Sequence, residues 1–353
     1  MSVTKDLSSV NRWLLTVALI FVIVIAIKMV SFIVTLILMS LILTLLTLPA
    51  IHWLRQKGLT DFQAVLVITC VAILIVLAFI FFTMLSFNSL VADLPQFQDE
   101  LDTRLRDINA MLNSYGITTT TEGPLSIKLG DIMGFGYSSL VSVAEAVEFI
   151  FFVGVTTFFL LLDAPRLRLV MEEWFGRDSE TMRQLSCMTG YVIDFIVVRT
   201  ETNFIHGILF GGFLGIIGVH GAILWGVLTF LLGYIPFIGL VIAAIPAIFF
   251  AWLQFGIPGA LAVIAAVCVL NLLVENPVYS FLAARKFEMP ALIVILSVIF
   301  WGWLLGLVGM LFSVPFTLLL LLVFEISDEL RWINRALGVH HLFEDKKTCE
   351  TKS

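Results

Sequence analysis

A carboxylate within an apolar stretch is the residue of this sequence best suited to chemistry. Glu275 lies about ten residues before Arg285, or roughly 15 Å along a continuous helix. At membrane depth a charged side chain costs on the order of 3 kcal/mol unless water, a cation or a partner compensates. Asn271 and Tyr279 lie one turn to either side on the same face, and Asn276 follows directly. These residues form a candidate pathway for a cation or polar solute, with a structural bond to a neighbouring helix as the alternative.

A second candidate is the sequence GYIPFIG, which runs from Gly233 to Gly239 between apolar stretches. Proline removes a backbone donor and glycine loosens the turn, so carbonyl groups can remain free at membrane depth. Free carbonyls around Tyr234 and Pro236 could bind a cation or a polar solute. A tight turn between two spans explains the motif equally well.

A third candidate lies on a helix that we expect to begin near Ser179. Tyr191, Asp194 and Glu201 share one face of this helix, whereas Arg199 points away from Asp194. A solvated cytoplasmic face explains this pattern, and the lining of the inner mouth of a pathway is the alternative.

The sequence lacks the motifs of nucleotide-binding and zinc-dependent proteins. The sequence contains no GxxxxGK[ST] loop to hold nucleotide phosphates and no HExxH pair to bind zinc. The 5 histidines show no metal-ligand spacing beyond the adjacent pair at positions 340 and 341. We therefore expect no enzymatic activity, no metal, no cofactor and no nucleic-acid partner.

The amino-acid composition indicates that these candidate residues lie in a membrane protein. Of the 353 residues, 60% are hydrophobic and 13% are charged, and the mean hydropathy is +1.07. The apolar residues form long runs, and a run of roughly 20 residues crosses about 30 Å of hydrocarbon as a helix. A β-barrel would instead show short stretches of period two. The predicted fold is all-α, a polytopic transmembrane bundle with eight to ten hydrophobic segments and amphipathic extramembrane helices.

The expected apolar segments are 13–27, 30–48, 62–87, 141–162, 204–219, 222–235, 237–255, 259–282, 291–305 and 307–324. Several are short and interrupted by glycine or proline, so they are either full crossings or re-entrant hairpins. Two glycine stripes allow neighbouring helices to approach closely. They consist of Gly207, Gly211 and Gly215, and of Gly302 and Gly306.

The distribution of lysine and arginine predicts the orientation. Basic residues gather before 13, at 55–57, at 166–183, at 285–286 and in the tail, and these loops should be cytoplasmic. The insert 88–140 is mostly acidic and should face outside. The predicted regions are 1–87 with three spans, the insert 88–140, the fourth span 141–162, cytoplasmic helices over 163–203, the core 204–325 and the tail 326–353. Both termini should be cytoplasmic in a multi-pass protein of the inner (plasma) membrane.

Two amphipathic helices are expected outside the spans. Leu94, Phe97, Leu101, Leu105, Ile108 and Leu112 recur at steps of three and four in the outer insert. This face packs on the protein's own outer surface or on lipid headgroups, or it forms a contact between subunits. The second helix is opened by Asp163 and Pro165 and ends before Gly176.

Three blocks of the C-terminal half carry a family resemblance. GYIPFIGLVIAAIP from Gly233, ENP from Glu275 and LSVIFWGWLLGLVGMLFSVP from Leu296 resemble the autoinducer-2 exporter family, and the basic loop HWLRQKG from His52 fits its layout. The resemblance implies a polytopic transporter that exports autoinducer-2 in some members and exchanges sodium for protons in others. It also implies a homo-oligomer, with a pentamer as one candidate.

The residues and the resemblance together favour a secondary carrier or exporter of a small polar solute such as autoinducer-2. A sodium/proton antiporter of the same family is one alternative. A channel and a non-transporting membrane scaffold are the others.

Overall fold

Every regular element in the described part of the chain is a helix, as predicted. The computed structural model describes residues 9–92, 129–177, 179–236, 238–284, 289–327 and 329–339, with a few positions between 97 and 114. In chain order the helices are α1 (Ser9–Met29), α2 (Ser31–Gln56), α3 (Asp61–Ala92), α5 (Leu129–Phe175), α6 (Glu180–Ile217), α7 (Ala222–Leu232), α8 (Gly239–Ala284), α9 (Ala291–Leu311), α10 (Ser313–Ile326) and α11 (Arg331–Ala336).

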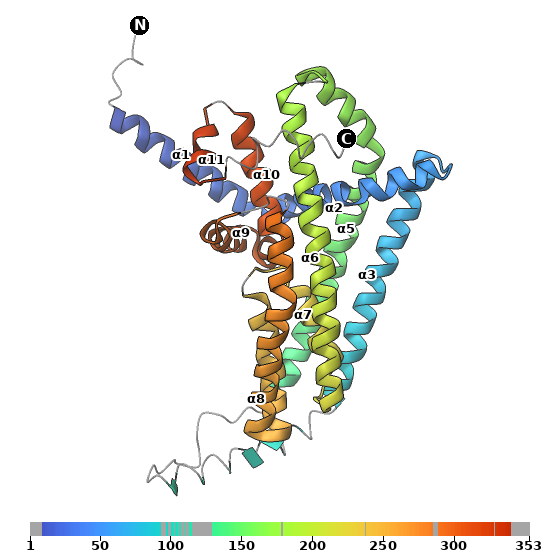
Figure 1. Ribbon diagram of the computed structural model, residues 1–353, viewed down its shortest axis with the longest axis vertical. Helices are drawn as coiled ribbons and strands as arrows, with labels where there is room; N and C mark the ends of the chain where they lie inside the picture. Colours follow the sequence, from blue (N-terminus) through green and yellow to red (C-terminus); the bar gives the residue numbers. More distant parts are fainter. Residues whose placement is uncertain are drawn as a thin grey trace.

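The helices agree with a polytopic membrane protein. Among the described residues, α2, α3, α5, α8 and α9 contain stretches long and apolar enough to cross a membrane, and parts of α1, α7 and α10 are shorter apolar helices. Each predicted apolar segment falls on these helices or on α6. The helices extend beyond some segments, because α5 begins 12 residues before the segment 141–162 and α6 begins 24 residues before the segment 204–219. Figure 1 shows α3, α5, α6 and α8 running along the long axis of the molecule, with α2 crossing them.

The prediction that a new helix begins at Asp163 and Pro165 is wrong. Pro165 lies inside α5, which continues without a break from Leu129 to Phe175. The sequence rule fails because an internal proline removes one backbone hydrogen bond, and packing around the flanking turns can outweigh that loss. The predicted end of this helix before Gly176 is confirmed, since Gly176 has a φ of +84°.

The predicted start of the next helix near Ser179 is confirmed. The Ser179 hydroxyl caps α6 by accepting a hydrogen bond from the Met182 backbone N–H at 3.2 Å. From there α6 runs to Ile217, and Gly218 ends it with a φ of +80°. The helix passes unbroken through residue 203, so the predicted limit between the cytoplasmic helices and the core does not coincide with a helix end.

Two of the helices are hairpins. At Gly256 in α8 the backbone has φ 70° and ψ −156°, and at Gly306 in α9 it has φ 70° and ψ −150°. Only glycine adopts this conformation readily. The predicted segments are separated at these two glycines, although the sequence left full crossings and hairpins open. The predicted stripe of Gly302 and Gly306 is wrong, because Gly306 forms the reversal and no atom lies within 4 Å of a methyl group added to it.

The two hairpins share a second glycine, three residues after the first. A methyl group on Gly259 would lie 2.5 Å from the Ala251 carbonyl oxygen, and one on Gly309 would overlap the Trp301 carbonyl oxygen. In both hairpins the contacted carbonyl belongs to the fifth residue before the turn. The same spacing therefore produces the same close crossing of the two limbs at two places in the chain.

The outer insert contacts the tip of the α8 hairpin. The Phe97 ring is buried and packs edge-on against Phe250, with centroids 4.7 Å apart. Arg104 donates from Nε to the Leu253 carbonyl at 3.0 Å and from Nη2 to the Gln254 carbonyl at 3.1 Å. These contacts agree with packing on the protein's own surface, although several of the apolar positions predicted for this face lie outside the described residues.

Helices α6 and α7 meet along glycine. A methyl group on Gly226 of α7 would lie 2.7 Å from the Gly207 carbonyl oxygen and 3.1 Å from the Gly211 Cα. The predicted stripe of Gly207 and Gly211 is therefore a helix contact, whereas Gly215 lies farther from α7. Such contacts suit lipid, where close van der Waals packing replaces the hydrophobic effect between helices.

The glycine contact can be tested by a matched pair of substitutions. Gly226→Ala should lower the free energy of unfolding by about 1–3 kcal/mol, because its methyl group would press on the α6 backbone. Gly212→Ala on α6 is the control, since no atom lies within 4 Å of its added methyl group. Unfolding of the purified protein in detergent measures both. Equal stability of the two variants would contradict the contact.

Candidate functional site

Three polar side chains lie buried along one face of α6. Arg199, Asn203 and His206 follow one another at steps of four and three, so they lie along one face. Their exposed fractions are 4%, 1% and 3%. A buried cation and two buried polar groups are costly among apolar spans, and in membrane proteins such residues commonly mark a pathway.

The other side of this face is formed by α7 and the turn after it. Thr229 of α7 is 1% exposed. Gly233 lies against Asn203 so closely that a methyl group on it would be 2.5 Å from the Asn203 side-chain oxygen and 2.9 Å from the Thr229 carbonyl oxygen. Asn203 therefore packs on Gly233, and Thr229 lies one helical turn before Gly233, whose N–H donates to the Thr229 carbonyl at 2.9 Å. We call this meeting point of α6, α7 and the turn the junction.

Two polar atoms at this junction have no hydrogen-bond partner among the described residues. They are the Asn203 side-chain nitrogen and the Thr229 hydroxyl, and both atoms are buried. A buried polar group without a partner typically costs about 1–3 kcal/mol. The two unpaired atoms therefore do not stabilise the fold. A bound polar molecule would supply the missing hydrogen-bond partners.

Tyr234 connects this junction to the second hairpin. Thr200 donates its hydroxyl hydrogen to the Ile196 carbonyl at 2.6 Å, so the Tyr234 hydroxyl is the donor in its 2.6 Å contact with Thr200. The Tyr234 ring also stacks on Phe312, which links α9 to α10, with centroids 6.1 Å apart. The site is thus bordered by α6, α7 and the α9–α10 junction.

The motif GYIPFIG forms a tight turn between α7 and α8. The Ile235 carbonyl accepts from the Gly239 N–H at 3.1 Å, and the Pro236 carbonyl accepts from the Ile238 N–H at 2.8 Å. These two carbonyls already have donors, in contrast to the free carbonyls that the sequence suggested. Gly239 packs on the Leu232 carbonyl, where a side chain has no room. The motif positions Gly233 and Tyr234, and its role in a pathway stays a prediction.

The structure places Arg199 and Glu201 in different surroundings. Arg199 is buried, whereas Glu201 is exposed and borders a largely apolar cavity of about 750 Å³ between α3 and α6–α7. Asp194 is half-buried. Of the predicted face of Tyr191, Asp194 and Glu201, only Tyr191 is buried, and Arg199, which was predicted to point away from Asp194, is buried as well.

The acidic candidate on α8 is only partly described. The backbone of α8 is helical through Ala284, and Asn271 is exposed on it. The side chains of Glu275, Asn276 and Tyr279 lie outside the described residues. The role of Glu275 therefore stays a prediction.

Sequence reasoning missed Asn203, His206 and Thr229. The signal was available, because Arg199, Asn203 and His206 recur at helical spacing. A predicted region limit at 203/204 divided the three residues between a cytoplasmic helix and a span. Thr229 carries no such signal, since one threonine in an apolar helix is common.

The site offers hydrogen-bonding groups rather than metal ligands. No group of three histidine, cysteine, aspartate or glutamate side chains that could hold a metal ion occurs among the residues that were described. A guanidinium, an amide, an imidazole and hydroxyls instead suit a solute rich in oxygen atoms.

Comparison with known proteins assigns the family. The sequence matches the family model described as AI-2E family transporter over residues 14–328. The chain belongs to the AI-2E transporter family. The C-terminal blocks that resembled this family are therefore correctly interpreted, and the AI-2E protein is a membrane transporter.

Relatives of this AI-2E protein share most of its length. It is 33% identical over 239 residues to AI-2 transport protein TqsA of Escherichia coli (strain K12), which covers 67% of this chain and 70% of TqsA. It is 30% identical over 329 residues to a Haemophilus influenzae protein named for an inferred transport role, which covers 90% of this chain and 94% of that one. YhhT of Escherichia coli (strain K12), also named for an inferred transport role, is 26% identical over 305 residues.

The bond between Tyr234 and Thr200 can be measured by a double-mutant cycle. Tyr234→Phe and Thr200→Val should each destabilise the protein, and the coupling free energy between them should be about 1 kcal/mol, because both remove the same hydrogen bond. Unfolding in detergent of both single variants and the double variant gives this value. Strictly additive effects would show that the two hydroxyls do not interact.

Proposed function

We propose that this protein is a secondary carrier that exports a small polar solute, and that the junction of Asn203, Thr229 and Gly233 forms part of its binding site. The observation that carries the proposal is the pair of buried, unpartnered polar atoms at this junction. Autoinducer-2 is the first candidate solute, because TqsA is named as an AI-2 transport protein. Its polar, oxygen-rich chemistry suits the donors that surround the junction.

Arg199 and His206 extend the proposed site along α6. They lie one turn to either side of Asn203 and are equally buried. Tyr234 and the Gly233–Gly239 turn border it, so a shift of the turn or of the α9 hairpin would alter access to the junction. Carriers commonly bind their solutes beside interrupted helices of this kind.

Glu275 remains our proposal for the coupling residue. A carboxylate on the second limb of α8 could take up a proton or a sodium ion during export. The sodium/proton antiporter keeps the same role for Glu275, and the junction on α6 favours the polar solute over that alternative. We also propose a homo-oligomer in the inner membrane.

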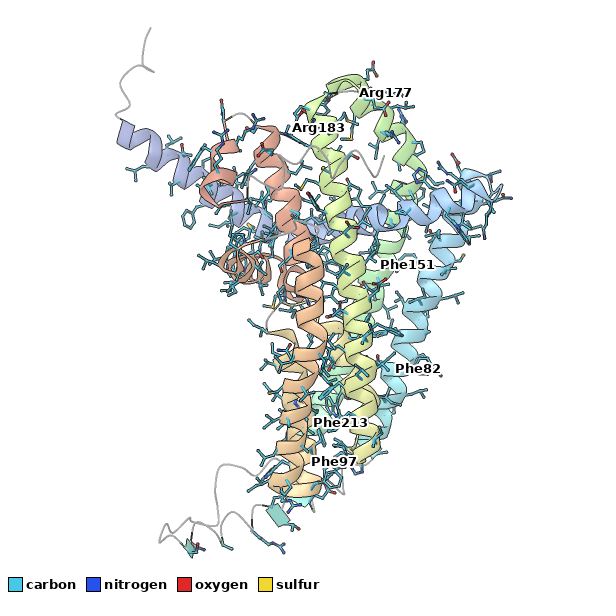
Figure 2. The ribbon with its side chains drawn as sticks, in the orientation of Figure 1. Phe82, Phe97, Phe151, Arg177, Arg183 and Phe213 are labelled. Atoms are coloured by element: carbon cyan, nitrogen blue, oxygen red, sulfur yellow. The ribbon has the colours of Figure 1, made fainter. Side chains whose placement is uncertain are left out.

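Charge indicates which end of the protein faces the cytoplasm. Figure 2 shows Arg177 and Arg183 at one end of the long axis and Phe97 of the insert at the opposite end. We place the arginine-rich end in the cytoplasm, since basic residues accumulate on that side of membrane proteins. We also propose that both termini are cytoplasmic.

Transport by Asn203→Leu tests the site. The substitution removes a buried amide nitrogen that has no partner among the described residues, so stability and assembly should not fall, yet export into liposomes should drop at least ~10-fold. Thr83→Val is the control, because the Thr83 hydroxyl donates to the Phe79 carbonyl of its own helix α3. Wild-type export of labelled autoinducer-2 and other polar solutes by Asn203→Leu would refute the site.

Cysteine labelling tests the orientation. In a background without native cysteines, Asn113→Cys should react with an impermeant thiol reagent in intact cells, and Glu173→Cys should react only after the membrane is opened. Both positions are exposed, so accessibility on the folded protein is matched. The reverse pattern of labelling would invert the proposed orientation.

A further inference from the structure

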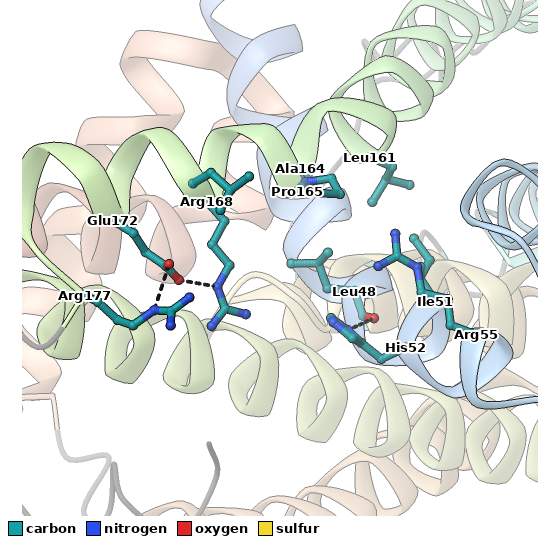
Figure 3. Close-up of a pocket in the computed structure, with 11 residues that line it drawn as sticks. Leu48, Ile51, His52, Arg55, Leu161, Ala164, Pro165, Arg168, Glu172 and Arg177 are labelled. Carbon is teal, nitrogen blue, oxygen red and sulfur yellow. Dashed lines mark hydrogen bonds and ion pairs between the residues drawn. The ribbon is translucent and has the colours of Figure 1, made fainter.

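A second cavity lies apart from the proposed transport site, where the end of α2 meets the last turns of α5. Its volume is about 390 Å³. Figure 3 shows that Leu48, His52 and Arg55 border it from α2, and Pro165, Arg168 and Glu172 from α5. Arg177, just beyond α5, completes the charged part. None of these residues belongs to the junction on α6.

Two arginines are held together on one wall of this cavity by a single carboxylate. Glu172 accepts from Arg168 Nε at 2.9 Å and from Arg177 Nε at 3.1 Å. The Glu172 side chain is 11% exposed, whereas the arginine side chains are 74% and 77% exposed. Both bonds use Nε, so the terminal nitrogens of the two guanidinium groups remain available as donors. Adjacent guanidinium groups of this kind bind phosphate oxygens well.

The α2 side of the cavity adds fixed polar groups. Arg55 Nε pairs with Asp61 at 2.9 Å, and the His52 Nδ1 lies 2.9 Å from the Leu48 carbonyl. Because a carbonyl only accepts, Nδ1 carries the hydrogen and Nε2 is left for another partner. The charged residues that line the cavity are three arginines and one glutamate, so its walls carry a net charge of about +2 with His52 neutral.

The remaining wall is apolar. Ile51 and Leu161 are 2% exposed and belong to one packed cluster, and Leu48 packs against them. Both α2 and α5 are apolar up to this level and then become charged. The cavity therefore combines a cationic wall and an apolar wall at the point where two membrane helices leave the hydrocarbon region.

We propose that this cavity binds the phosphodiester headgroup of an anionic phospholipid, with Arg168 and Arg177 as the phosphate ligands and the Leu48–Leu161 wall against the first part of the acyl chains. Basic pockets beside membrane helices at the cytoplasmic surface are suited to such lipids. A free phosphate shares the charge but makes no use of the apolar wall. The proposal does not depend on which solute is transported.

Lipid titration of the purified full-length protein tests this site. Binding of phosphatidylglycerol and phosphatidylcholine in neutral detergent is followed by native mass spectrometry, with inorganic phosphate and glycerol 3-phosphate as soluble competitors. The triple variant Arg168→Gln, Glu172→Gln, Arg177→Gln removes the guanidinium pair without leaving an unpaired carboxylate. Its affinity for phosphatidylglycerol should fall at least ~10-fold, since two charge-assisted contacts are lost.

Arg183→Gln is the matched control. Arg183 lies at the same end of the protein and pairs with Glu180 outside the cavity, and its replacement changes the net charge by one unit, as the triple variant does. It should bind phosphatidylglycerol like the wild type. Equal binding by the triple variant, or equal binding of phosphatidylcholine, would overturn the site. Displacement of the lipid by a soluble phosphate at the same concentration would overturn the lipid assignment.

Discussion

The close approach of α6 and α7 through Gly207, Gly211 and Gly226 is the constraint on which the central arrangement depends. Lipid is as apolar as the side chains of the spans, so burial from water cannot hold two helices together inside it. The helices associate instead because each glycine lets the opposite backbone come within van der Waals contact. This contact fixes how α6 is rotated about its axis. That rotation turns Asn203 toward Gly233, and leaves Glu201 exposed on another side.

Glycine also allows close backbone contact within the two hairpins. At Gly256 and Gly306 the chain turns in a conformation that side chains disfavour, and Gly259 and Gly309 let the limbs cross without a Cβ between them. The first tip is held by Arg104, which supplies donors to the last carbonyls of the first limb. The second hairpin leads into Phe312, which stacks on Tyr234. The first hairpin is therefore part of α8, which follows the turn after α7, and the second hairpin leads to the ring that contacts Tyr234.

Polar groups in this protein are distributed between two different tasks. On α6 they are buried within the bundle, where a polar solute could satisfy them. Around Glu172 they are gathered at a helix end, where guanidinium groups keep most of their exposure. The first arrangement is costly without a ligand, and the second is inexpensive because water solvates its charges. Because of this difference in environment, we assign transport to the polar groups of α6 and a lipid contact at the surface to the groups around Glu172.

The sequence by itself determined the helical class, the apolar segments, the end of α5 and the start of α6, whereas it left open whether the segments around Gly256 and Gly306 are full crossings or hairpins. Each of these follows from local chemistry, namely the length of an apolar run, a serine cap, or a glycine where the chain must turn. It also indicated the family, through blocks that the comparison bore out.

Only the tertiary structure decided which polar faces meet. In a soluble helix, alternation of polar and apolar residues shows which side faces the core, but spans that are apolar all round carry little information about their rotation. The sequence placed Arg199 away from Asp194 without giving it partners, whereas the structure groups it with Asn203 and His206 on the buried face of α6. Pro165 was misread for a related reason, because its local preference for a helix start is outweighed by the packing of a long span. The cavity between α2 and α5 likewise exists only because residues over a hundred positions apart along the chain come together.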